Sequence, residues 1–442
     1  MSKYRKFSSE CDDLTVRIKS RPVRRLVDWR FVLKPSDSNM RVLQFAPRVC
    51  WPLDTGAKLR NYHLARVLAQ RAAVSLLAFS DHQESSANLE KFYEQVITVR
   101  RDSAYTFAKL VRGGVGSIPL PVLNYTTHSM TRELEHLLGE HDFDIIQLES
   151  IHLMSYLANI RAAGSRDTHK RPIVVCDWHN IESELMQRYS EREPGRFRRA
   201  YARRTARLMS EFEKRALRDF DAHIVVSQRD ADRMRVINPN ARIFVIENGV
   251  DTGFYSDLEG KAESPARRIV FVGSMDYHAN IDGAVNFARA VWPRSRELQP
   301  DLIFTIVGKD PAPDVRELAQ LPGIEVTGTV SDVRPFYREA IAAVVPLKVG
   351  GGSRLKILEA MAAGVPVVST TLGAEGLDVQ HDKNIVIADT NEELVESLNS
   401  LVSNEERRQH LSAAGRALVS RFYDWSRLGA SLFNAYEELI GN

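Results

Sequence analysis

Short apolar runs recur along the chain, and each is followed by a polar loop and a stretch with helical periodicity. The runs are rich in Val and Ile and do not alternate with polar residues, as is typical of strands buried on both faces of a parallel sheet. This alternation of strand and helix predicts an α/β fold with doubly wound sheets. The predicted strands are 42–46, 74–79, 96–99, 145–149, 173–177, 223–227 and 243–247 in the first half, and 269–273, 302–308, 324–328, 343–347, 365–369 and 385–388 in the second.

The predicted strands fall into two sets, separated by the polar segment 251–267, whose composition is typical of a linker. We therefore expect two Rossmann-like domains that face a cleft, one at 40–250 and one at 268–424. Residues 1–39 are polar and charged and lack the apolar core of a secretory signal. We expect them to form an N-terminal extension without a role in the fold.

Composition narrows the classes of function. Of the 442 residues, 44% are hydrophobic and 26% are charged, which are ordinary values for a globular enzyme. The formal net charge of +3 is too small to indicate a nucleic-acid partner. The three cysteines are too widely spaced for a disulfide framework or a zinc site, and no apolar run is long enough to span a membrane. These features predict a cytoplasmic protein.

A glycine-rich loop between a strand and a helix is the most informative motif. After the strand that ends at Leu347, residues 348–356 read Lys-Val-Gly-Gly-Gly-Ser-Arg-Leu-Lys. Glycines let a ligand approach the backbone amides, and amides at a helix N-terminus favour phosphate. We predict that this loop binds a diphosphate through Lys348, Gly350, Gly351, Gly352 and Ser353.

The charges that follow the loop support this prediction. Arg354 and Lys356 lie near the positive end of the helix dipole, where a cation is unfavourable by roughly 0.3–1 kcal/mol unless an anion binds nearby. Glu359 lies three residues past Lys356 and is suited to the hydroxyls of a sugar or a ribose. The alternative is a solvated Lys356–Glu359 pair on an ordinary helix.

A second candidate loop follows the first strand. Ligands of open parallel sheets bind at the carboxyl ends of the strands, so residues after strands are the ones to inspect. The loop after 42–46 leads to Gly56, Lys58 and Arg60 at the start of a helix. These residues either face the bound diphosphate across the cleft or form a connection with two surface cations.

Two more strand ends in the first half carry polar residues. His179 and Asn180 follow the strand 173–177, and Glu149 ends the strand 145–149. His179 is therefore a candidate site residue, with Asn180 as a secondary group. Glu149 is a further candidate at the same edge of the sheet. The alternative for His179 is a structural or simply exposed histidine.

The segment 188–218 is strongly basic. It contains eleven Arg or Lys residues and four Glu, interleaved with Leu208, Phe212 and Leu217. One interpretation is a solvated helical face. The other is contact with anionic lipid headgroups or with a lipid-diphosphate acceptor, at the inner face of the plasma membrane.

Several motifs of other enzyme classes are absent or misplaced. The Asp-x-Asp triplets at 142–144 and 219–221 precede strands, at the sheet edge opposite the ligands, and the triplet at 230–232 begins a helix. We therefore expect no essential metal and no cofactor. No Gly-x-Gly-x-x-Gly motif follows a strand, and no Gly-Lys-Ser/Thr loop or Gly-x-Ser-x-Gly elbow occurs. These absences argue against a dinucleotide oxidoreductase and an NTPase.

The second half of the chain carries a series of short motifs. They are Phe-Val-Gly at 271–273, Ile-Val-Gly at 306–308, Val-Thr-Gly at 326–328 with Val-Ser-Asp-Val at 330–333, and Leu-Glu-Ala-Met-Ala-Ala-Gly-Val-Pro-Val-Val at 358–368, together with Asn-Gly-Val-Asp at 248–251. In their order and spacing, over roughly 180 residues, the chain from residue 269 onwards resembles the retaining GT-B glycosyltransferases of family 4, also called the group 1 glycosyltransferases.

The resemblance implies roles for individual residues. It gives Glu359 the nucleotide ribose, with the loop at Gly56 meeting both the donor phosphates and the acceptor. It places His179 near the reactive carbon of the donor sugar, where His179 would position a substrate or stabilise a transition state. The first glutamate of the family's pair would fall at Gly351, so the sequence departs from the family there. Further donor-side candidates are Gly273 and Lys309, the catalytic candidates are His179, Arg354 and Lys356, and the acceptor-side candidates are Lys58, Arg60, Glu149 and Asn180.

The resemblance also implies an activity. It predicts a metal-independent glycosyltransferase that moves a sugar from a nucleotide-sugar to a glycan, lipid-linked or other hydroxyl acceptor with retention of configuration, in a bacterial exopolysaccharide or cell-surface glycan pathway. It predicts as well that the last helix, 425–442, returns to the N-terminal domain. The alternatives are a GT-B nucleotide-sugar epimerase or hydrolase, and a non-catalytic nucleotide-sugar binding protein, which only Gly351 favours.

Overall fold

The computed structural model describes residues 40–80, 86–101, 106, 109, 112–113, 116–163, 171–258, 267–349 and 354–441. Two sequence-based predictions therefore lie outside the described residues. These are the N-terminal extension, residues 1–39, and the four residues 350–353 of the glycine-rich loop.

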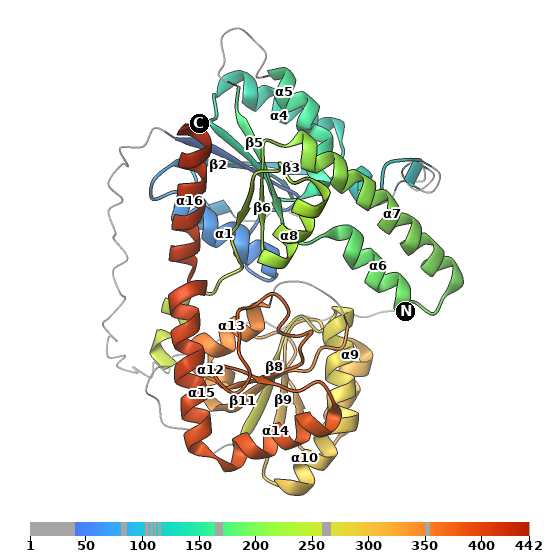
Figure 1. The fold of residues 1–442 in the computed structure, drawn as a ribbon, viewed down its shortest axis with the longest axis vertical. Coiled ribbons are helices and arrows are strands. Elements are labelled where there is room, and N and C mark those ends of the chain that lie inside the picture. Colours follow the sequence, from blue (N-terminus) through green and yellow to red (C-terminus); the bar gives the residue numbers. More distant parts are fainter. Residues whose placement is uncertain are drawn as a thin grey trace, which may run out of the picture. The chain divides into compact units, whose positions relative to one another are not determined.

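Two parallel sheets organise the described chain and confirm the predicted α/β, doubly wound fold (Figure 1). The first sheet has the order β3-β2-β1-β4-β5-β6-β7 and the second the order β10-β9-β8-β11-β12-β13. The strands are β1 Arg41–Ala46, β2 Ala73–Ser80, β3 Gln95–Arg100, β4 Ile145–Leu148, β5 Ile173–Trp178, β6 Ala222–Val225, β7 Ile243–Val245, β8 Arg268–Val272, β9 Ile303–Val307, β10 Ile324–Val326, β11 Ala340–Val345, β12 Val367–Ser369 and β13 Val386–Ile387.

Each predicted apolar run corresponds to one of these strands. The largest shift is at β11, which starts at Ala340, three residues before the predicted start. Its first residues are small, and its pairing with β8 shifts register between Ala340 and Ala342. Small residues next to an irregular pairing carry little of the Val and Ile signal that marks the other strands.

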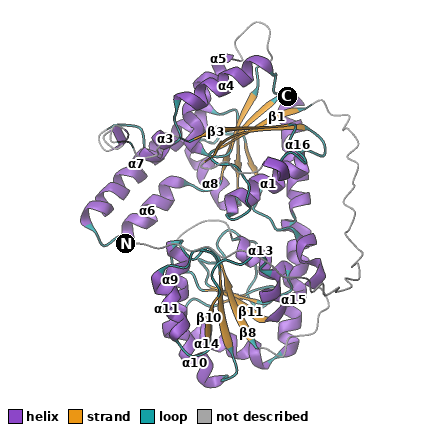
Figure 2. Ribbon diagram, turned by 180° about the vertical axis from the view of Figure 1, so that it is seen from behind, coloured by secondary structure: helices purple, strands orange, loops and turns teal. Residues whose placement is uncertain are grey.

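Helices cover both faces of each sheet (Figure 2). In the first half they are α1 Gly56–Leu68, α3 Leu120–Asn124, α4 His128–Glu140, α5 Leu157–Ala163, α6 Glu182–Arg192, α7 Arg196–Asp219 and α8 Gln228–Ile237. In the second half they are α9 His278–Asn286, α10 Trp292–Leu298, α11 Pro313–Glu317, α12 Arg334–Glu339, α13 Leu355–Ala362, α14 Asn391–Ser403, α15 Glu405–Leu418 and α16 Trp425–Gly441. Helices α6 and α7 form a hairpin that reaches away from the first sheet (Figure 1).

Local sequence signals explain several helix boundaries. The Thr55 side chain caps α1 by accepting from the Lys58 amide, and Thr390 and Glu393 form a reciprocal capping box on α14. Helix α13 ends at Gly364, whose φ of +74° is a conformation that glycine adopts without strain. The Thr55 cap fixes the start of α1, which follows the candidate loop after β1.

The last helix, α16, packs against α1 of the first half of the chain. The approach is close, because a Cβ atom added at Gly429 would lie 2.5 Å from Val67. The ring of His63 in α1 stacks on Trp425 with an interplanar angle of 2° and a centroid distance of 5.5 Å. The C-terminal end of the chain thus lies on the domain that holds β1.

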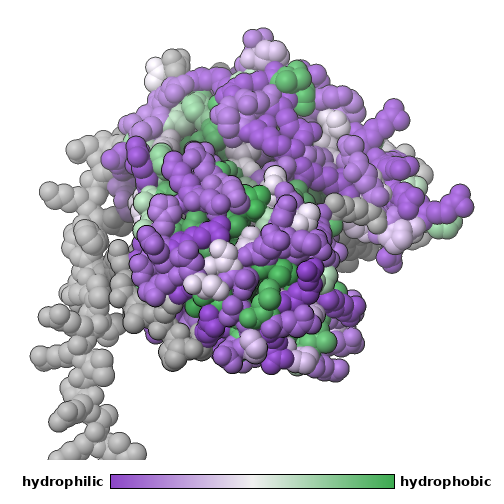
Figure 3. Space-filling view, turned by 60° about the horizontal axis from the view of Figure 1, so that its bottom comes forward, coloured by the Kyte–Doolittle hydropathy of each residue, from purple (hydrophilic) through white to green (hydrophobic). Residues whose placement is uncertain are grey.

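The surface shown in Figure 3 is largely hydrophilic, with hydrophobic residues in separate patches. The apolar side chains of the strands are buried between the helix layers, as in Phe45, Ile146 and Phe271. In the part of the chain that the structure describes, no helix combines the length and the apolar character needed to cross a membrane.

Candidate functional site

Both sheets reverse their strand order at one point, and the candidate residues collect there. The first sheet reverses between β1 and β4 and the second between β8 and β11. Phe45 pairs with Leu148, so β1 and β4 end at the same edge of the sheet. A crevice outside the carboxyl ends of strands at such a reversal is where open α/β sheets bind ligands.

The loop after β1 contacts the second domain through an ion pair. Lys309 follows β9, and its Nζ atom donates to Asp54 Oδ2 at 2.9 Å. Asp54 also pairs with Lys58 Nζ at 3.1 Å, and the two ammonium groups hold the pKa of the Asp54 carboxyl below its usual value. Gly56 begins α1 directly after these contacts. Gly56, Lys58 and Lys309 are therefore brought together at this edge.

On the side of the second sheet, Lys356 lies against the end of β8. Its Nζ atom donates to Asn280 Oδ1 at 2.5 Å and lies 5.2 Å from the centre of the Phe271 ring. Gly273 leaves room for both side chains, because an added Cβ would lie 2.8 Å from Asn280 Nδ2 and 3.4 Å from Lys356 Nζ. Gly273 and Lys356, far apart in the sequence, thus form one surface.

The two ionisable residues of α13 have displaced pKa values. Burial, followed by the nearby Arg354 cation, lowers the pKa of Lys356 to about 7. Burial raises the pKa of Glu359 to about 7, although the Lys356 cation acts in the opposite direction. Each group is charged at a free-energy cost in the protein alone, so a ligand that compensates the charge would be favoured. Both side chains are only partly accessible, unlike those of a fully solvated pair.

Lys348 points elsewhere. Its Nζ atom donates to Asn391 Oδ1 at 2.9 Å, at the start of α14. It therefore lies at the carboxyl edge of the second sheet but contacts a different helix from Lys356. The glycines between Lys348 and Arg354, through which the two were expected to act together, lie outside the described residues.

His179 follows β5 and contacts a buried carboxylate. Its Nε2 atom lies 3.3 Å from Glu149 Oε2 and 3.9 Å from Asp177 Oδ2. Glu149 accepts a second set of hydrogen bonds at Oε1, from Gln44 at 2.6 Å and Gln147 at 2.5 Å. The imidazole is thus held on its Nε2 side by the carboxylates of Glu149 and Asp177, at the carboxyl end of β5.

Asp177 is fixed in turn by Arg60 of α1. Nε and Nη2 of Arg60 donate to the two oxygens of Asp177 at 2.9 and 3.1 Å, and both side chains are 0% exposed. Arg60 also donates to the Glu247 carbonyl oxygen at 2.9 Å. A bidentate pair of this kind fixes geometry as well as charge.

Two acceptor-side predictions do not agree with this arrangement. Arg60 has no exposed surface, so it supports Asp177 and does not face an acceptor. Glu149 is 1% exposed and contacts His179 and two glutamines instead of the solvent. Both residues follow the pattern that predicted them, but their side chains turn into the core because complementary polar partners lie there.

Glu149, Asp177 and His179 form a group whose ligand atoms lie within 4.8 Å of one another. Donors of the chain already bind three of the four carboxylate oxygens, namely Oε1 of Glu149 and both oxygens of Asp177. Gln44 and Gln147 donate to Glu149, and Arg60 donates twice to Asp177. A buried guanidinium next to the site would also repel a cation.

The Asp-x-Asp triplets lie where the sequence placed them. Asp144 precedes β4 and accepts from the Arg41 amide at 2.9 Å, while Asp221 precedes β6 and accepts from the Val174 amide at 2.8 Å. Both therefore bind backbone at the opposite edge of the first sheet. Asp230 of the third triplet is different, because it lines the pocket described next.

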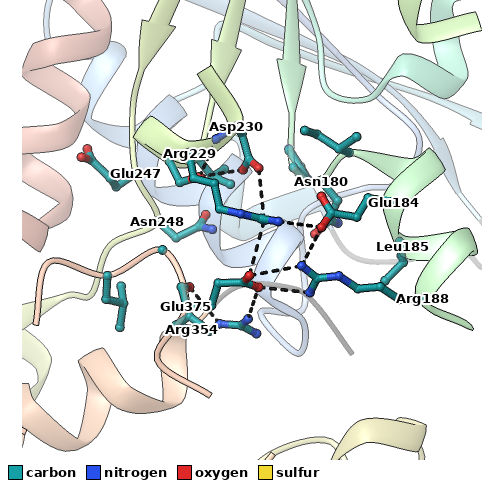
Figure 4. Close-up of a pocket in the computed structure, with 16 residues that line it drawn as sticks. Asn180, Glu184, Leu185, Arg188, Arg229, Asp230, Glu247, Asn248, Arg354 and Glu375 are labelled. Carbon is teal, nitrogen blue, oxygen red and sulfur yellow. Dashed lines mark hydrogen bonds and ion pairs between the residues drawn. The ribbon is translucent and has the colours of Figure 1, made fainter. Parts of the chain in front are cut away.

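A pocket between the two domains joins the candidates from both sheets (Figure 4). His179 and Asn180 line it from the first domain, and Arg354 lines it from the second. Arg354 is 8% exposed, and burial lowers the pKa of its guanidinium. The wall is completed by Ile181, Glu184, Leu185, Arg188, Val226, Ser227, Arg229, Asp230, Glu247, Asn248, Glu375, Gly376 and Leu377.

Besides Arg188, sequence reasoning missed five charged residues of this pocket as site residues: Glu184, Arg229, Asp230, Glu247 and Glu375. Arg229 follows β6 and Glu375 follows β12, so inspection of every strand end would have included both. Glu184 lies in the first turn of α6, one turn before Arg188. Arg188 had been counted only within the basic segment.

The architecture defines the class of protein. Sucrose-phosphate synthase from Thermosynechococcus elongatus superposes on the chain with a TM-score of 0.64 at 16% identity, over 91% of this chain and 100% of that one. Anabaena HepE, solved in complex with UDP and glucose, gives a TM-score of 0.60 at 16% identity, over 90% of this chain and 99% of that one. The chain has the GT-B fold of these structures.

Sequence matches identify the family. Residues 55–254 match the Glycosyltransferase Family 4 domain, and residues 266–404 match the domain described as Glycosyl transferases group 1. The chain belongs to these glycosyltransferases, as its motifs predicted. The MMP alpha-(1->4)-mannosyltransferase of Mycolicibacterium hassiacum is 25% identical over 242 residues, which cover 52% of this chain and 57% of that protein. The chain spans about half the length of the curated relatives it matches.

Proposed function

We propose that the protein transfers a sugar from a nucleotide-sugar donor to a hydroxyl acceptor on a glycan or a lipid-linked molecule. One observation carries this proposal. His179, at the end of β5, and Arg354, before α13, line the same pocket although they belong to different domains. A nucleotide-sugar bound across that pocket would place its sugar near His179 and its diphosphate near Arg354.

The donor diphosphate would bind on the side of the second sheet. Lys356 beside Gly273, together with Arg354, would stabilise the negative charge that develops on the leaving diphosphate. Glu359, on the same helix as Lys356, would accept from the ribose hydroxyls. The loop residues Gly350–Ser353 complete the proposed donor site, with Lys348 and Lys309 at its edge.

We further propose that transfer retains the anomeric configuration and needs no metal. The acceptor would attack from the face of the leaving diphosphate, whose oxygen would take the acceptor proton as the glycosidic bond forms. The hydrogen bonds that Glu149 Oε1 and both oxygens of Asp177 already accept from the chain support metal independence. His179 would position the sugar in this scheme.

A screen of UDP, GDP, ADP and their sugars by thermal shift would test the donor class, followed by transfer assays with glycan and lipid-linked acceptors. NMR of the product would report its anomeric configuration, and EDTA would test the need for a metal. Turnover of the donor without an acceptor would favour the epimerase or hydrolase. Donor binding without turnover across the acceptor panel would favour the non-catalytic binding protein.

We also propose that the hairpin of α6 and α7 contacts an anionic membrane at its cytoplasmic face. Phe197, at the start of α7, is 93% exposed and Tyr201 is 42% exposed. Arg196, Arg203 and Arg207 are exposed and spaced by seven and four residues, so they share one face of the helix. An exposed aromatic beside a cationic stripe is typical of interfacial helices.

Sedimentation with vesicles would test this contact. We expect binding to vesicles that contain phosphatidylglycerol and little binding to pure phosphatidylcholine. Phe197→Ser and Arg203→Glu should each weaken it, while Arg235→Glu, on the exposed surface of α8, serves as a control. Equal binding of all variants would exclude the hairpin as the contact.

A further inference from the structure

Three arginines converge on one carboxylate at the pocket between the domains (Figure 4). Nη1 and Nη2 of Arg188 donate to the two oxygens of Glu375, each at 3.1 Å. Arg229 Nη1 lies 3.5 Å from Glu375 Oε1, and Arg354 Nη2 lies 3.3 Å from Glu375 Oε2. Arg188 and Arg229 come from the first domain, whereas Arg354 and Glu375 come from the second.

A second carboxylate shares two of these arginines. Glu184 Oε1 accepts from Arg188 and from Arg229, each at 2.6 Å, and its other oxygen accepts from Arg233. Glu184 joins α6 to α8, so it holds Arg188 and Arg229 side by side. The position of these two guanidinium groups is therefore set within the first domain and does not depend on Glu375.

The charges of this cluster do not cancel. Four arginines, at 188, 229, 233 and 354, face the carboxylates of Glu184, Glu375 and Asp230. With every group ionised, these residues carry one positive charge in excess. Burial raises the pKa of the Asp230 carboxyl, which makes the excess larger when that group is protonated. In the pocket wall itself, three arginines face four carboxylates, because Glu247 lines the wall and Arg233 does not, and all three arginines share the Glu375 carboxylate.

The contact between Arg188 and Glu375 has the geometry of oxyanion recognition. Two parallel hydrogen bonds from one guanidinium to two oxygens suit carboxylate and phosphate equally. Glu375 lies on a segment between β12 and β13 and retains 27% of its side-chain surface exposed. A side chain in that position can turn to the solvent and leave its place to another anion.

We propose that Arg188 and Arg229 form a subsite for an oxyanion, a phosphate or a carboxylate, that is carried by the acceptor and takes the place of Glu375. The proposal rests on the proposed transferase function, because only a transferase has an acceptor. It assigns the anion to the acceptor because both arginines belong to the first domain and share the pocket with His179 and Asn180. The cations of the proposed donor diphosphate, Arg354 and Lys356, belong to the second domain, although Arg354 also contacts Glu375.

Binding of inorganic phosphate tests the subsite. Phosphate would be titrated by ³¹P NMR line broadening in the presence of a saturating nucleoside diphosphate, so that the donor site is already occupied. We expect saturable binding that weakens tenfold or more in Arg188→Ala and in Arg229→Ala. Glu375→Gln should strengthen it, because this change removes the competing internal anion. Arg233→Ala is the matched control, since Arg233 contacts Glu184 but does not line the pocket.

Small sugars then distinguish the class of anion. Glucose 6-phosphate and glucuronate would be tested as competitors of bound phosphate, with glucose as the neutral reference. Competition by either charged sugar and not by glucose supports the subsite and identifies its preferred anion. Equal competition by all three overturns the proposal, since the sugar and not the anion is then recognised.

Two further results overturn the proposal. If the nucleoside diphosphate abolishes phosphate binding, the arginines belong to the donor site. If neither the wild-type protein nor Glu375→Gln binds phosphate, the cluster only holds the domains together. Nucleotide binding, measured in the same samples by thermal shift, separates these results from a failure of the proposed donor site, because that failure would show as a loss of nucleotide binding.

Discussion

The two sides of the candidate site differ in how completely the chain satisfies its own polar groups. On the side of the first sheet, Glu149 and Asp177 accept hydrogen bonds from glutamines and from Arg60 within the core. On the side of the second sheet, Lys356 and Glu359 keep displaced pKa values, because burial is only partly compensated. The first side is held in shape by the chain's own groups, whereas we propose that a ligand completes the second side.

Loss of Arg60 should have the largest effect, because it leaves the Asp177 carboxylate buried without its partner. We expect Arg60→Met to lower the free energy of unfolding by about 3–5 kcal/mol, measured by urea denaturation. Arg66→Met is the control, since its pair with Asp251 is partly exposed and contributes about 0–1 kcal/mol. Restoration of stability by Asp177→Asn in the Arg60→Met background would sharpen the assignment, and equal losses at Arg60 and Arg66 would contradict it.

His179→Ala should affect turnover and spare donor affinity. The side chain is held by Glu149 and is proposed to act on the sugar, not on the nucleotide. We expect kcat to fall by about 100-fold, within the range of positioned catalytic groups, while the donor Kd stays nearly constant. Glu149→Gln keeps the shape of the partner and should give a smaller loss with a changed pH profile. Unchanged turnover in His179→Ala would remove the residue from the site.

On the other side, the expected effect is on donor binding. Arg354→Ala or Glu359→Ala should each weaken the binding of the true donor by tenfold or more, about 1.4 kcal/mol, in calorimetric titrations. Because the ligand completes this side, the loss of stability without ligand should be smaller than the loss seen for Arg60→Met. Near-normal titration of both variants would show that the donor binds elsewhere.

Donor affinity should also depend on pH. Above pH 7 Lys356 loses its positive charge and Glu359 gains a negative one, since both have a pKa of about 7. Loss of the Lys356 charge disfavours a diphosphate, so affinity should fall as the pH rises from 6 to 8, by up to about tenfold. A nucleotide-sugar is the proper probe because its diphosphate does not titrate in this range. Lys356→Met should flatten the profile, and a profile that rises with pH would contradict the assignment.

The sequence predicted the fold more completely than the site. Runs of Val and Ile mark the strands of both sheets because parallel strands are buried on both faces, and this signal is local. The direction of a polar side chain after a strand is not local. Arg60 and Glu149 were placed at the correct edge, but their partners Asp177 and Gln44 are distant in the sequence and turn them into the core.

The contacts of the arginine cluster could not be predicted either, because they join residues that are distant in the sequence. Arg188 was visible only as part of a basic helix, and Glu375 only as a residue after a strand. Their contact joins α6 to a loop of the second domain, a separation of 187 residues. No periodicity or spacing within one element contains that information, so the subsite emerges only when the two domains are seen together.

The return of α16 to the first domain means that the polypeptide passes between the domains twice. The two passages are bonded to each other, since the Val250 amide donates to the Tyr423 carbonyl at 2.8 Å and the Trp425 amide donates to the Val250 carbonyl at 3.2 Å. Two chain segments that are hydrogen-bonded side by side allow bending about one axis and resist twisting. A cut at residue 250 would therefore not release two independent halves, because the first half would lose the helix that covers α1.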